Sequence, residues 1–417
     1  MNIVHYTILI DSTSQTDTFL NLLLNDKLLP DFSELAGKTG ALFSSSQIAH
    51  YLDKEEKHGI KLITKNTSQS LITMSSGERK KALLNYTLES SPDYLIVVNP
   101  FDNLDYHYQK ELKGKLLTLA ADLPIIQIIN RVEDFLPLAA NYAKLEGDKL
   151  IHFDSKTHLF SETIKTKSTF SKLNIPRPLN AKLFTGNNLV RLRSVSVSFN
   201  DKPVLSNISW QIHSGDFWQL KGPNGSGKST LLAMITGDSQ KGYGQELYLF
   251  GTKKGSGESV WDIKKNIGYF TPAMTDKFRG YHTLENMLIS GLHDSIGLYV
   301  KPTEIEKRLA SDWLELLQLS AKKTQYFHQL STTEKRMLLT ARAMIKHPPL
   351  LLLDEPTSGL DDSSALLFVS LVNKIANDST TAIVYVSHRE EKGLDPKKVF
   401  ELIPIKNGST GKIKSFK

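Results

Sequence analysis

A glycine-rich loop at residues 222–230 constrains the fold of this chain more than any other stretch. It fits the pattern G-x-x-x-x-G-K-[ST], in which glycines let backbone N–H groups face phosphates, the lysine reaches the β- and γ-oxygens and the hydroxyl meets Mg²⁺. A strand at 217–220 precedes the loop and a helix begins near 231, so the loop opens a helix N-terminus that attracts anions. The sequence therefore predicts a nucleoside triphosphate site with Mg²⁺. Its residues are Gly222, Pro223, Asn224, Gly225, Ser226, Gly227, Lys228, Ser229 and Thr230.

The composition indicates a cytoplasmic, multidomain globular protein. The chain has 417 residues, of which 40% are hydrophobic, enough for two or three cores. The absence of cysteine excludes disulfides and thiolate metal sites. No apolar run approaches the ~20 residues of a membrane span, and the N-terminus lacks the charged region of a signal peptide. The net charge of +7 is too modest to indicate a nucleic-acid or membrane partner.

The chain contains an internal duplication. Residues 3–10 predict a strand followed by a polar loop and an apolar helix, which copies the layout around 222–230. Aligning the polar loop at 11–18 with 222–229 places Asp17 opposite Lys228 and leaves no glycine in the first loop. Further along, Ser75 and Ser331 stand 256 residues apart, as do Pro100 and Pro356 and also Asp105 and Asp361. The first copy is therefore shorter and lacks the phosphate loop.

These patterns predict an α/β chain with two P-loop domains in tandem. We expect a degenerate domain at 1–147, a linker at 148–187 rich in Lys, Thr and Ser, an intact domain at 188–405 and a flexible basic tail at 406–417. The intact domain should carry antiparallel strands at 190–199 and 204–212. It should also carry an amphipathic helix at 301–319. The predicted buried face of that helix comprises Ile305, Leu309, Trp313, Leu316 and Leu317.

Two acidic residues follow a strand of four leucines at 350–353. A buried parallel strand delivers Asp354 and Glu355 to the sheet edge beside the phosphate loop. Asp354, with Ser229, is placed to hold Mg²⁺, and Glu355 is placed to polarise an attacking water. His388 ends another apolar strand at 384–387, from which it could reach the γ-phosphate. We predict that Lys228, Glu355 and His388 are the catalytic residues.

Taken together, these motifs make residues 188–405 resemble a nucleotide-binding domain of the ABC ATPases. The resemblance implies ATP as the nucleotide, a D-loop at 358–361, a switch histidine at His388 and an adenine-stacking aromatic at Phe199. Residues 255–264 and 290–299 resemble, more narrowly, the tandem cytosolic ABC proteins of the ModF and photorepair type. Such proteins carry two ABC domains on one polypeptide.

The family's head-to-tail pairing implies one working ATP site. Each ATP lies between one domain's phosphate loop and the other domain's signature motif. The first half keeps a good signature in Ser75, Ser76, Gly77 and Glu78, but Val98, Asn99 and Asn130 replace the acidic residues and the histidine. In the second half, threonines occupy the signature at 331–334. The loop at 222–230 should therefore be completed by residues 75–78 and bordered by Asp105. Pro272 stands where the family has its Q-loop glutamine.

The sequence is compatible with three functions. The first is an ATPase serving as the ATP-binding component of an ABC transporter, peripheral at the inner face of the cell membrane and docked to a separate permease. The second is a soluble ABC ATPase that acts on nucleic acid or the ribosome. The third is a regulatory ATP sensor with negligible turnover, which the missing Q-loop glutamine and the single working site leave open.

Overall fold

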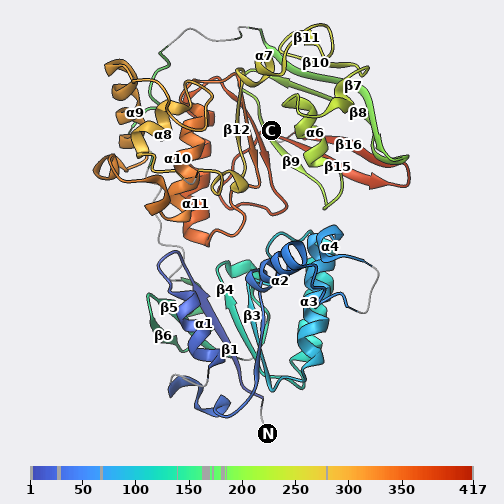
Figure 1. Cartoon of the computed structure of the whole chain (residues 1–417), viewed down its shortest axis with the longest axis vertical. Coiled ribbons are helices and arrows are strands. Elements are labelled where there is room, and N and C mark those ends of the chain that lie inside the picture. Colours follow the sequence, from blue (N-terminus) through green and yellow to red (C-terminus); the bar gives the residue numbers. More distant parts are fainter. Residues whose placement is uncertain are drawn as a thin grey trace. The chain divides into compact units, whose positions relative to one another are not determined.

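The structure, a computed structural model, divides the chain into two compact units (Figure 1). The first comprises Met1–Thr166 together with the short segment Gly359–Ser364, and the second comprises Lys167–Ser358 and Ala365–Lys417. The structure describes residues 3–415 except 26–29, 66–68, 139, 162–169, 171–172, 180–183, 185 and 279. Within those residues, no helix has the length and apolar character needed to cross a membrane.

A six-stranded sheet in the order β2-β3-β4-β1-β5-β6 forms the centre of the first unit. All pairs are parallel except β5 with β6, which form an antiparallel hairpin at one edge. The strands are β1 (His5–Ile10), β2 (Gly40–Phe43), β3 (Tyr94–Val98), β4 (Ile125–Ile129), β5 (Ala140–Glu146) and β6 (Lys149–Phe153). The helices are α1 (Thr16–Leu24), α2 (Ser45–His58), α3 (Ser76–Glu89), α4 (Tyr106–Leu119) and α5 (Lys156–Ser161).

Both faces of this sheet are covered, because successive side chains of its strands point to opposite faces. On β3, Leu95 and Val97 join one hydrophobic core with residues of α2, α3 and α4. Tyr94 and Ile96, which alternate with them, join a second core with residues of α1 and β1. The continuous apolar run at 94–98 is thus explained by burial on both sides.

The second unit contains a ten-stranded sheet in the order β11-β10-β7-β8-β16-β15-β9-β14-β13-β12. Strands β15, β9, β14, β13 and β12 pair in parallel, and the pairs among β11, β10, β7 and β8 are antiparallel. The strands are β7 (Asn188–Phe199), β8 (Lys202–His213), β9 (Phe217–Lys221), β10 (Leu247–Leu249), β11 (Thr252–Lys253), β12 (Ile267–Phe270), β13 (Leu350–Asp354), β14 (Ala382–Val386), β15 (Lys398–Ile405) and β16 (Gly408–Ser415).

Helices of the second unit surround the parallel half of this sheet. They are α6 (Lys228–Ile235), α7 (Val260–Lys264), α8 (Leu284–Ser290), α9 (Glu304–Leu316), α10 (Thr332–Met344) and α11 (Asp362–Asp378). Figure 1 shows α8, α9 and α10 gathered at one end of this unit and strands β7, β8, β10 and β11 at the other. The tandem α/β fold predicted from the sequence is confirmed.

The two sheets share one topology. In chain order, β1 to β6 occupy the same places in the first sheet as β9 and β12 to β16 occupy in the second. Lys80 donates to the carbonyls of Pro100 and Asp102, and Arg336 donates to those of Pro356 and Ser358. These contacts also stand 256 residues apart, so the duplication extends from sequence to hydrogen bonding. Among the described residues of the first copy there are no counterparts of β7, β8, β10 and β11.

Three expectations differ from the observed fold. Residues 408–415, expected in a flexible tail, form β16, which pairs along its whole length with β15. A two-residue turn joins these strands, so the polar residues belong to a hairpin rather than to a loose end. The first part of the expected linker holds β6 and α5, and several of its later residues lie outside the described ones. Ile305 is 65% exposed, whereas Leu309, Trp313, Leu316 and Leu317 are buried as predicted.

Candidate functional site

The predicted phosphate loop connects β9 to α6 in the second unit and needs its glycines. Gly222, Gly225 and Gly227 have φ of 156°, 74° and 93°, in the region that side chains rarely adopt. A Cβ on Gly227 would lie 2.6 Å from Leu205 of β8. Ser226 has a buried hydroxyl without a hydrogen-bond partner, inside a loop that should cradle an anion. This geometry suits the pattern's role as a phosphate cradle.

The three predicted catalytic side chains lie together at the end of the parallel strands. The Nζ of Lys228 donates to the carbonyls of Gly222 (2.8 Å) and Pro223 (3.0 Å) and lies 3.5 Å from Nδ1 of His388. The Nε2 of His388 contacts a carboxylate oxygen of Glu355. A lysine, a histidine and a glutamate from three different elements therefore form one cluster.

Burial and charge separate the two neighbouring carboxylates. Burial raises the pKa of Asp354, and the charge of Glu355 raises it further. Burial would also raise the pKa of Glu355, but the hydrogen bond and charge of His388 and the charge of Lys228 outweigh it, and the pKa is lowered. At neutral pH, Glu355 is thus held ionised, as a base must be. Asp354 is buried beside another negative charge, and a bound cation would lower the free-energy cost of ionising it.

The backbone at Glu355 is unusual for a glutamate. Its φ is 49°, a left-handed conformation that costs about 1 kcal/mol for a residue other than glycine, asparagine or aspartate. The N–H of Glu355 donates to the carbonyl of Val386 (3.0 Å), and its carbonyl accepts from Ser358 N–H (3.1 Å). The turn is therefore held at both ends, which keeps the carboxylate at the sheet edge.

The contacts that support His388 and Asp354 were not predicted from the sequence. Gln219 donates to the hydroxyl of Ser387 (2.9 Å), which donates to the carbonyl of Arg389 (2.8 Å), so the turn carrying His388 is fixed. The hydroxyl of Tyr269 lies 3.5 Å from Asp354. Tyr269 lies near the end of β12, three residues before Pro272. A polar aromatic residue at this strand end is the sequence signal that could have indicated a contact with Asp354.

Phe199 has the exposure that its predicted role requires. It ends β7 at a hairpin turn and is 43% exposed, so it is not a core residue. Lys241 Nζ lies 5.2 Å from the centroid of its ring. Val204 and Leu205, at the start of the next strand, contact the Cβ position of Gly227. The aromatic ring therefore belongs to the hairpin that packs against the phosphate loop.

The predicted signature motif opens α3 of the first unit. Ser75 and Glu78 form a capping box, in which each side chain binds the other's backbone N–H. Ser331 and Glu334 form the same box at α10. Ser76 donates to the carbonyl of Asn103 (2.9 Å).

Gly77 has a local reason to be glycine. A Cβ at this position would lie 2.7 Å from the ring of Tyr108 on α4. Close packing within the first unit therefore requires glycine, whatever ligand the backbone meets. Asp105 caps α4 by accepting from the N–H of Tyr108 (3.0 Å), so the predicted border residue also has a structural role.

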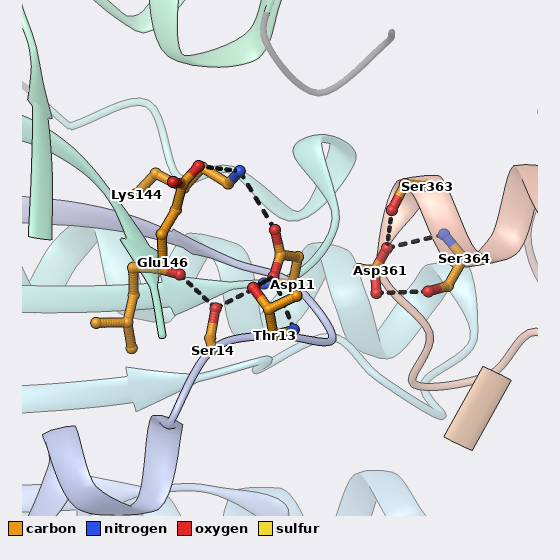
Figure 2. A network of polar contacts seen from close by, with 9 residues as sticks. Asp11, Thr13, Ser14, Lys144, Glu146, Asp361, Ser363 and Ser364 are labelled. Atoms are coloured by element: carbon orange, nitrogen blue, oxygen red, sulfur yellow. Dashed lines mark hydrogen bonds and ion pairs between the residues drawn. The ribbon is translucent and has the colours of Figure 1, made fainter. Parts of the chain in front are cut away.

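The loop of the first unit carries a carboxylate, Asp11, that is bonded within this unit. Asp11 accepts from the backbone and hydroxyl of Thr13, and Lys144 of β5 lies 3.3 Å from it (Figure 2). Burial would raise the pKa of Asp11, but the bonds from Thr13 and then the charge of Lys144 lower it. Ser14 donates to the carbonyl of Leu145, which binds the loop to β5. Thr13, Ser14 and Lys144, which carry hydrogen-bond donors that could meet a phosphate, are therefore bonded within the first unit.

Strand register corrects one predicted equivalence. Tyr6 pairs with Ile126 and Trp218 pairs with Val384, while α1 begins at Thr16 and α6 at Lys228. Thr16, rather than Asp17, therefore stands at the position of Lys228. The sequence alignment was wrong by one residue because it placed Asp11 opposite Gly222, whereas the strand register places Ile10 there. The carboxylate inside the loop is Asp11, and Asp17 is exposed on α1.

The predicted losses in the first unit hold in the structure's register. Val98 pairs with Ile128 as Asp354 pairs with Val386, and the following residues, Asn99 and Glu355, share a positive φ. Counting on from these pairs places Asn130 at the position of His388. The first unit therefore has amides where the second has its base and its histidine.

These observations define the class of protein. A glycine loop between a strand and a helix, two carboxylates after a buried parallel strand and a histidine on the neighbouring strand form a P-loop nucleoside triphosphatase site. The attached antiparallel strands and the group of helices α8, α9 and α10 are the additions that mark the ABC type.

Comparison with known proteins gives the family. The family model described as ABC transporter matches residues 205–358. The chain is 36% identical over 329 residues to the ABC transporter ATP-binding protein ModF of Escherichia coli, covering 76% of this chain and 67% of that protein. It is 30% identical to an uncharacterised ABC transporter ATP-binding protein of Schizosaccharomyces pombe, covering 78% of this chain and 66% of that one. The chain belongs to the ABC transporter ATP-binding proteins and has the parts of an ABC-type ATPase. Its matches span about two thirds of the length of these relatives.

Two solved structures share the fold over nearly the whole chain. A model of ribosome-bound archaeal Pelota and ABCE1 gives a TM-score of 0.66 at 13% identity, covering 99% of this chain and 75% of the other. The complex of archaeal stalk protein aP1 with the archaeal ribosome recycling factor aABCE1 gives 0.61 at 14%, covering 98% and 85%. At such identities the likeness concerns the fold alone.

Proposed function

We propose that this chain hydrolyses ATP at one site, built on residues 222–230, as the ATP-binding component of an ABC transporter. The observation that carries the proposal is the asymmetry between equivalent positions of the two copies. Lys228, Asp354, Glu355 and His388 cluster in the second unit. The first unit has Thr16, Val98, Asn99 and Asn130 at the same places.

The chemistry follows from the states of these groups. The backbone of residues 222–230 and the Lys228 ammonium bind the β- and γ-phosphates, and Phe199 stacks on the adenine. Glu355, kept ionised by His388 and Lys228, orients the attacking water and accepts its proton. His388 holds the carboxylate in place and carries part of the charge that develops on the γ-phosphate. Lys228 stabilises the remainder of that charge.

The residues present fit Mg²⁺. Ser229 exposes its hydroxyl at the first turn of α6, and Asp354 supplies a half-buried carboxylate, which are the oxygen donors that this ion prefers. When bound, the ion would neutralise charge on the β- and γ-phosphates.

A second part of the proposal concerns the signature motif. We assign Ser75, Ser76, Gly77 and Glu78 as the group that completes the ATP site, with Asp105 at its border. The support is that the first copy retains these residues although its own loop has no glycine and carries Asp11. In the second copy, Thr332 and Thr333 occupy the corresponding positions.

Hydrolysis is tested by removing the base and the lysine. Glu355→Gln should lower kcat for ATP by about 10² to 10⁴-fold with ATP binding retained, because the amide cannot accept the proton. Lys228→Ala should abolish binding as well. Asp17→Ala, an exposed change in the degenerate loop, is the control and should leave turnover unchanged. Wild-type turnover in Glu355→Gln would refute the assignment.

The signature assignment is tested by a matched pair of serines. Ser75→Ala and Ser331→Ala each remove an N-cap with the same capping box, so each should cost about 1 kcal/mol of stability. Only Ser75→Ala should lower kcat strongly, because only that serine is assigned to the site. Equal losses of kcat in the two variants would mean that both result from the lost helix cap, and would contradict the assignment of Ser75 to the site.

The transport role is tested by identifying what the chain binds in cells. Glu355→Gln, which should retain ATP, is purified from detergent-solubilised cells and from ribosome fractions. Recovery of a polytopic membrane protein supports the proposal. Co-sedimentation with ribosomes or nucleic acid would instead support a soluble ABC ATPase that acts on them. ATP binding without phosphate release in the wild type would support a regulatory ATP sensor.

A further inference from the structure

The two turns of the second unit that carry Glu355 and His388 are joined by a side-chain bridge. Thr357 follows Glu355 by two residues, and Glu391 follows His388 by three. The hydroxyl of Thr357 donates to the carboxylate of Glu391 (2.6 Å). The turns are therefore connected at a further point, in addition to the contact of His388 with Glu355.

Tyr385 extends this bridge into the core. It lies on β14 and is 0% exposed, and its hydroxyl oxygen lies 2.9 Å from that of Thr357. Thr357 is itself only 2% exposed. A hydroxyl has one proton, and Thr357 gives its proton to the carboxylate of Glu391, so Tyr385 must donate to Thr357. A chain of hydrogen bonds thus runs from Tyr385 through Thr357 to Glu391, and burial makes each bond costly to leave unmade.

Each turn is also fixed to its own surroundings in the second unit. In the first turn, Arg336 of α10 donates to the carbonyls of Pro356 and Ser358. Just after the second turn, the side-chain amide of Asn373 on α11 donates to the carbonyl of Gly393 (2.6 Å). With both turns held in this way, the bridge fixes their positions relative to one another.

The corresponding positions of the first copy do not form this bridge. Phe101, which stands 256 residues before Thr357, is a core residue without a hydroxyl. Strand register places Gln127 at the position of Tyr385, and Gln127 exchanges hydrogen bonds with the backbone of Leu136 instead. The copy that lacks the proposed base and histidine therefore also lacks the hydroxyls of the bridge. This association favours a role in catalysis over a role in the fold that both copies share.

We propose that Thr357 and Glu391, anchored by Tyr385, are positioning residues for Glu355 and His388. When water and the γ-phosphate draw the carboxylate and the imidazole to different atoms, the contact between these two side chains no longer holds the turns together. The bridge contains none of the residues assigned to ATP, so it remains and keeps the base in place. The inference rests on the proposed function for its kinetic consequence, whereas the bridge itself can be tested without ATP.

Replacing Thr357 by valine gives the kinetic test, because it removes the hydroxyl and nearly keeps the shape of the side chain. Thr357→Val should lower kcat for ATP by about tenfold with the Kd for ATP unchanged, because a small displacement of the base slows the reaction without removing a binding group. Thr357→Ser, which keeps the hydroxyl, should recover most of the loss. Wild-type kcat in Thr357→Val, or a raised Kd with unchanged kcat, would overturn the positioning role.

Two adjacent glutamates provide a matched pair for the other end of the bridge. The side chain of Glu390 is 92% exposed and its carboxylate pairs with Lys221 (3.1 Å), whereas Glu391 accepts from the buried Thr357. Glu391→Ala should lower kcat as Thr357→Val does, and Glu390→Ala should leave it at the wild-type value. A double variant with Thr357→Val and Glu391→Ala should be no slower than the slower single variant, because both changes remove the same bond. Losses that multiply in the double variant would overturn the bridge.

Amide hydrogen exchange on the whole chain without nucleotide tests the bridge apart from catalysis. Glu391→Ala should speed exchange in residues 387–394 by about tenfold, because this turn loses its bond to a buried group. Glu390→Ala should leave the exchange of these residues as in the wild type. Glu391→Ala changes the partly exposed end of the bridge, so it remains a test if Thr357→Val does not fold.

The outcomes separate the bridge from the proposed function. Exchange at residues 387–394 as slow in Glu391→Ala as in the wild type would overturn the bridge, whatever the turnover. A wild type without turnover would refute the proposed ATPase function and leave the exchange result standing.

Discussion

At the scale of single residues, electrostatics rather than residue type distinguishes the two carboxylates of the site. Asp354 and Glu355 are adjacent and similarly buried, yet the pKa of the first is raised and that of the second lowered. The difference arises because His388 hydrogen-bonds to Glu355, whereas Asp354 lies beside the charge of Glu355. The two carboxylates thus acquire different roles from their neighbours.

Removing His388 should therefore change the pH dependence of hydrolysis. In His388→Ala, burial of Glu355 is no longer offset by the histidine, so its pKa rises. The base works only when ionised, and the rate falls as pH drops through that pKa. The acid limb of the residual kcat profile should move to higher pH than in the wild type, with Asp17→Ala as the unchanged control. An acid limb at its original position would mean that Glu355 is not the base.

At the scale of elements, packing within the first unit explains part of the signature motif. The start of α3 approaches α4 so closely that a side chain at position 77 would clash with Tyr108, so only glycine fits there. The same glycine is assigned to the γ-phosphate in our proposal. Loss of activity after its replacement is therefore ambiguous unless the packing effect is measured separately.

A double-mutant cycle separates these two effects. Gly77→Ala should destabilise the protein by about 1 to 3 kcal/mol through overpacking against Tyr108. In a Tyr108→Ala background, the same change should cost much less, because the clash is gone. Denaturant unfolding measures both values. If the ATPase loss from Gly77→Ala persists in that background, the glycine acts on the nucleotide; recovery of turnover would assign it to packing alone.

At the scale of the whole molecule, duplication has produced two copies with different duties. Both retain the same strand order and the same anchoring of the turn after β3 or β13. The second copy retains the side chains that we propose as catalytic. The first has a loop without glycine, in which Asp11 pairs with Lys144.

This division predicts a stoichiometry of one ATP per chain. Isothermal titration of Glu355→Gln with Mg·ATP should give one site, and Lys228→Ala should give none. Restoring a lysine with Thr16→Lys should not create a second site, because Asp11 and a glycine-free loop remain. Two sites in Glu355→Gln would contradict the asymmetric arrangement.

The sequence by itself determined the class of protein and the duplication, and it predicted the residues that we propose as catalytic. These features rest on short motifs in which a glycine, a lysine or a carboxylate at fixed spacing has one chemical use. The sequence also predicted which positions of the first copy lack the lysine, the carboxylates and the histidine of the second. Strands 94–98 and 350–354 were evident because an apolar run ended by polar residues leaves little choice of structure.

Tertiary structure alone decided what depends on contacts between distant residues. The equivalence of Thr16 with Lys228 required strand register, since a loop without glycine or lysine offers no motif residue by which to align it. The strand β16 required its partners β15 and β8, because its own composition is that of a tail. The carboxylate in the first loop and the tyrosine beside Asp354 are polar side chains whose partners lie far along the chain. Their roles follow from the fold because hydrogen bonds and ion pairs depend on distance in space.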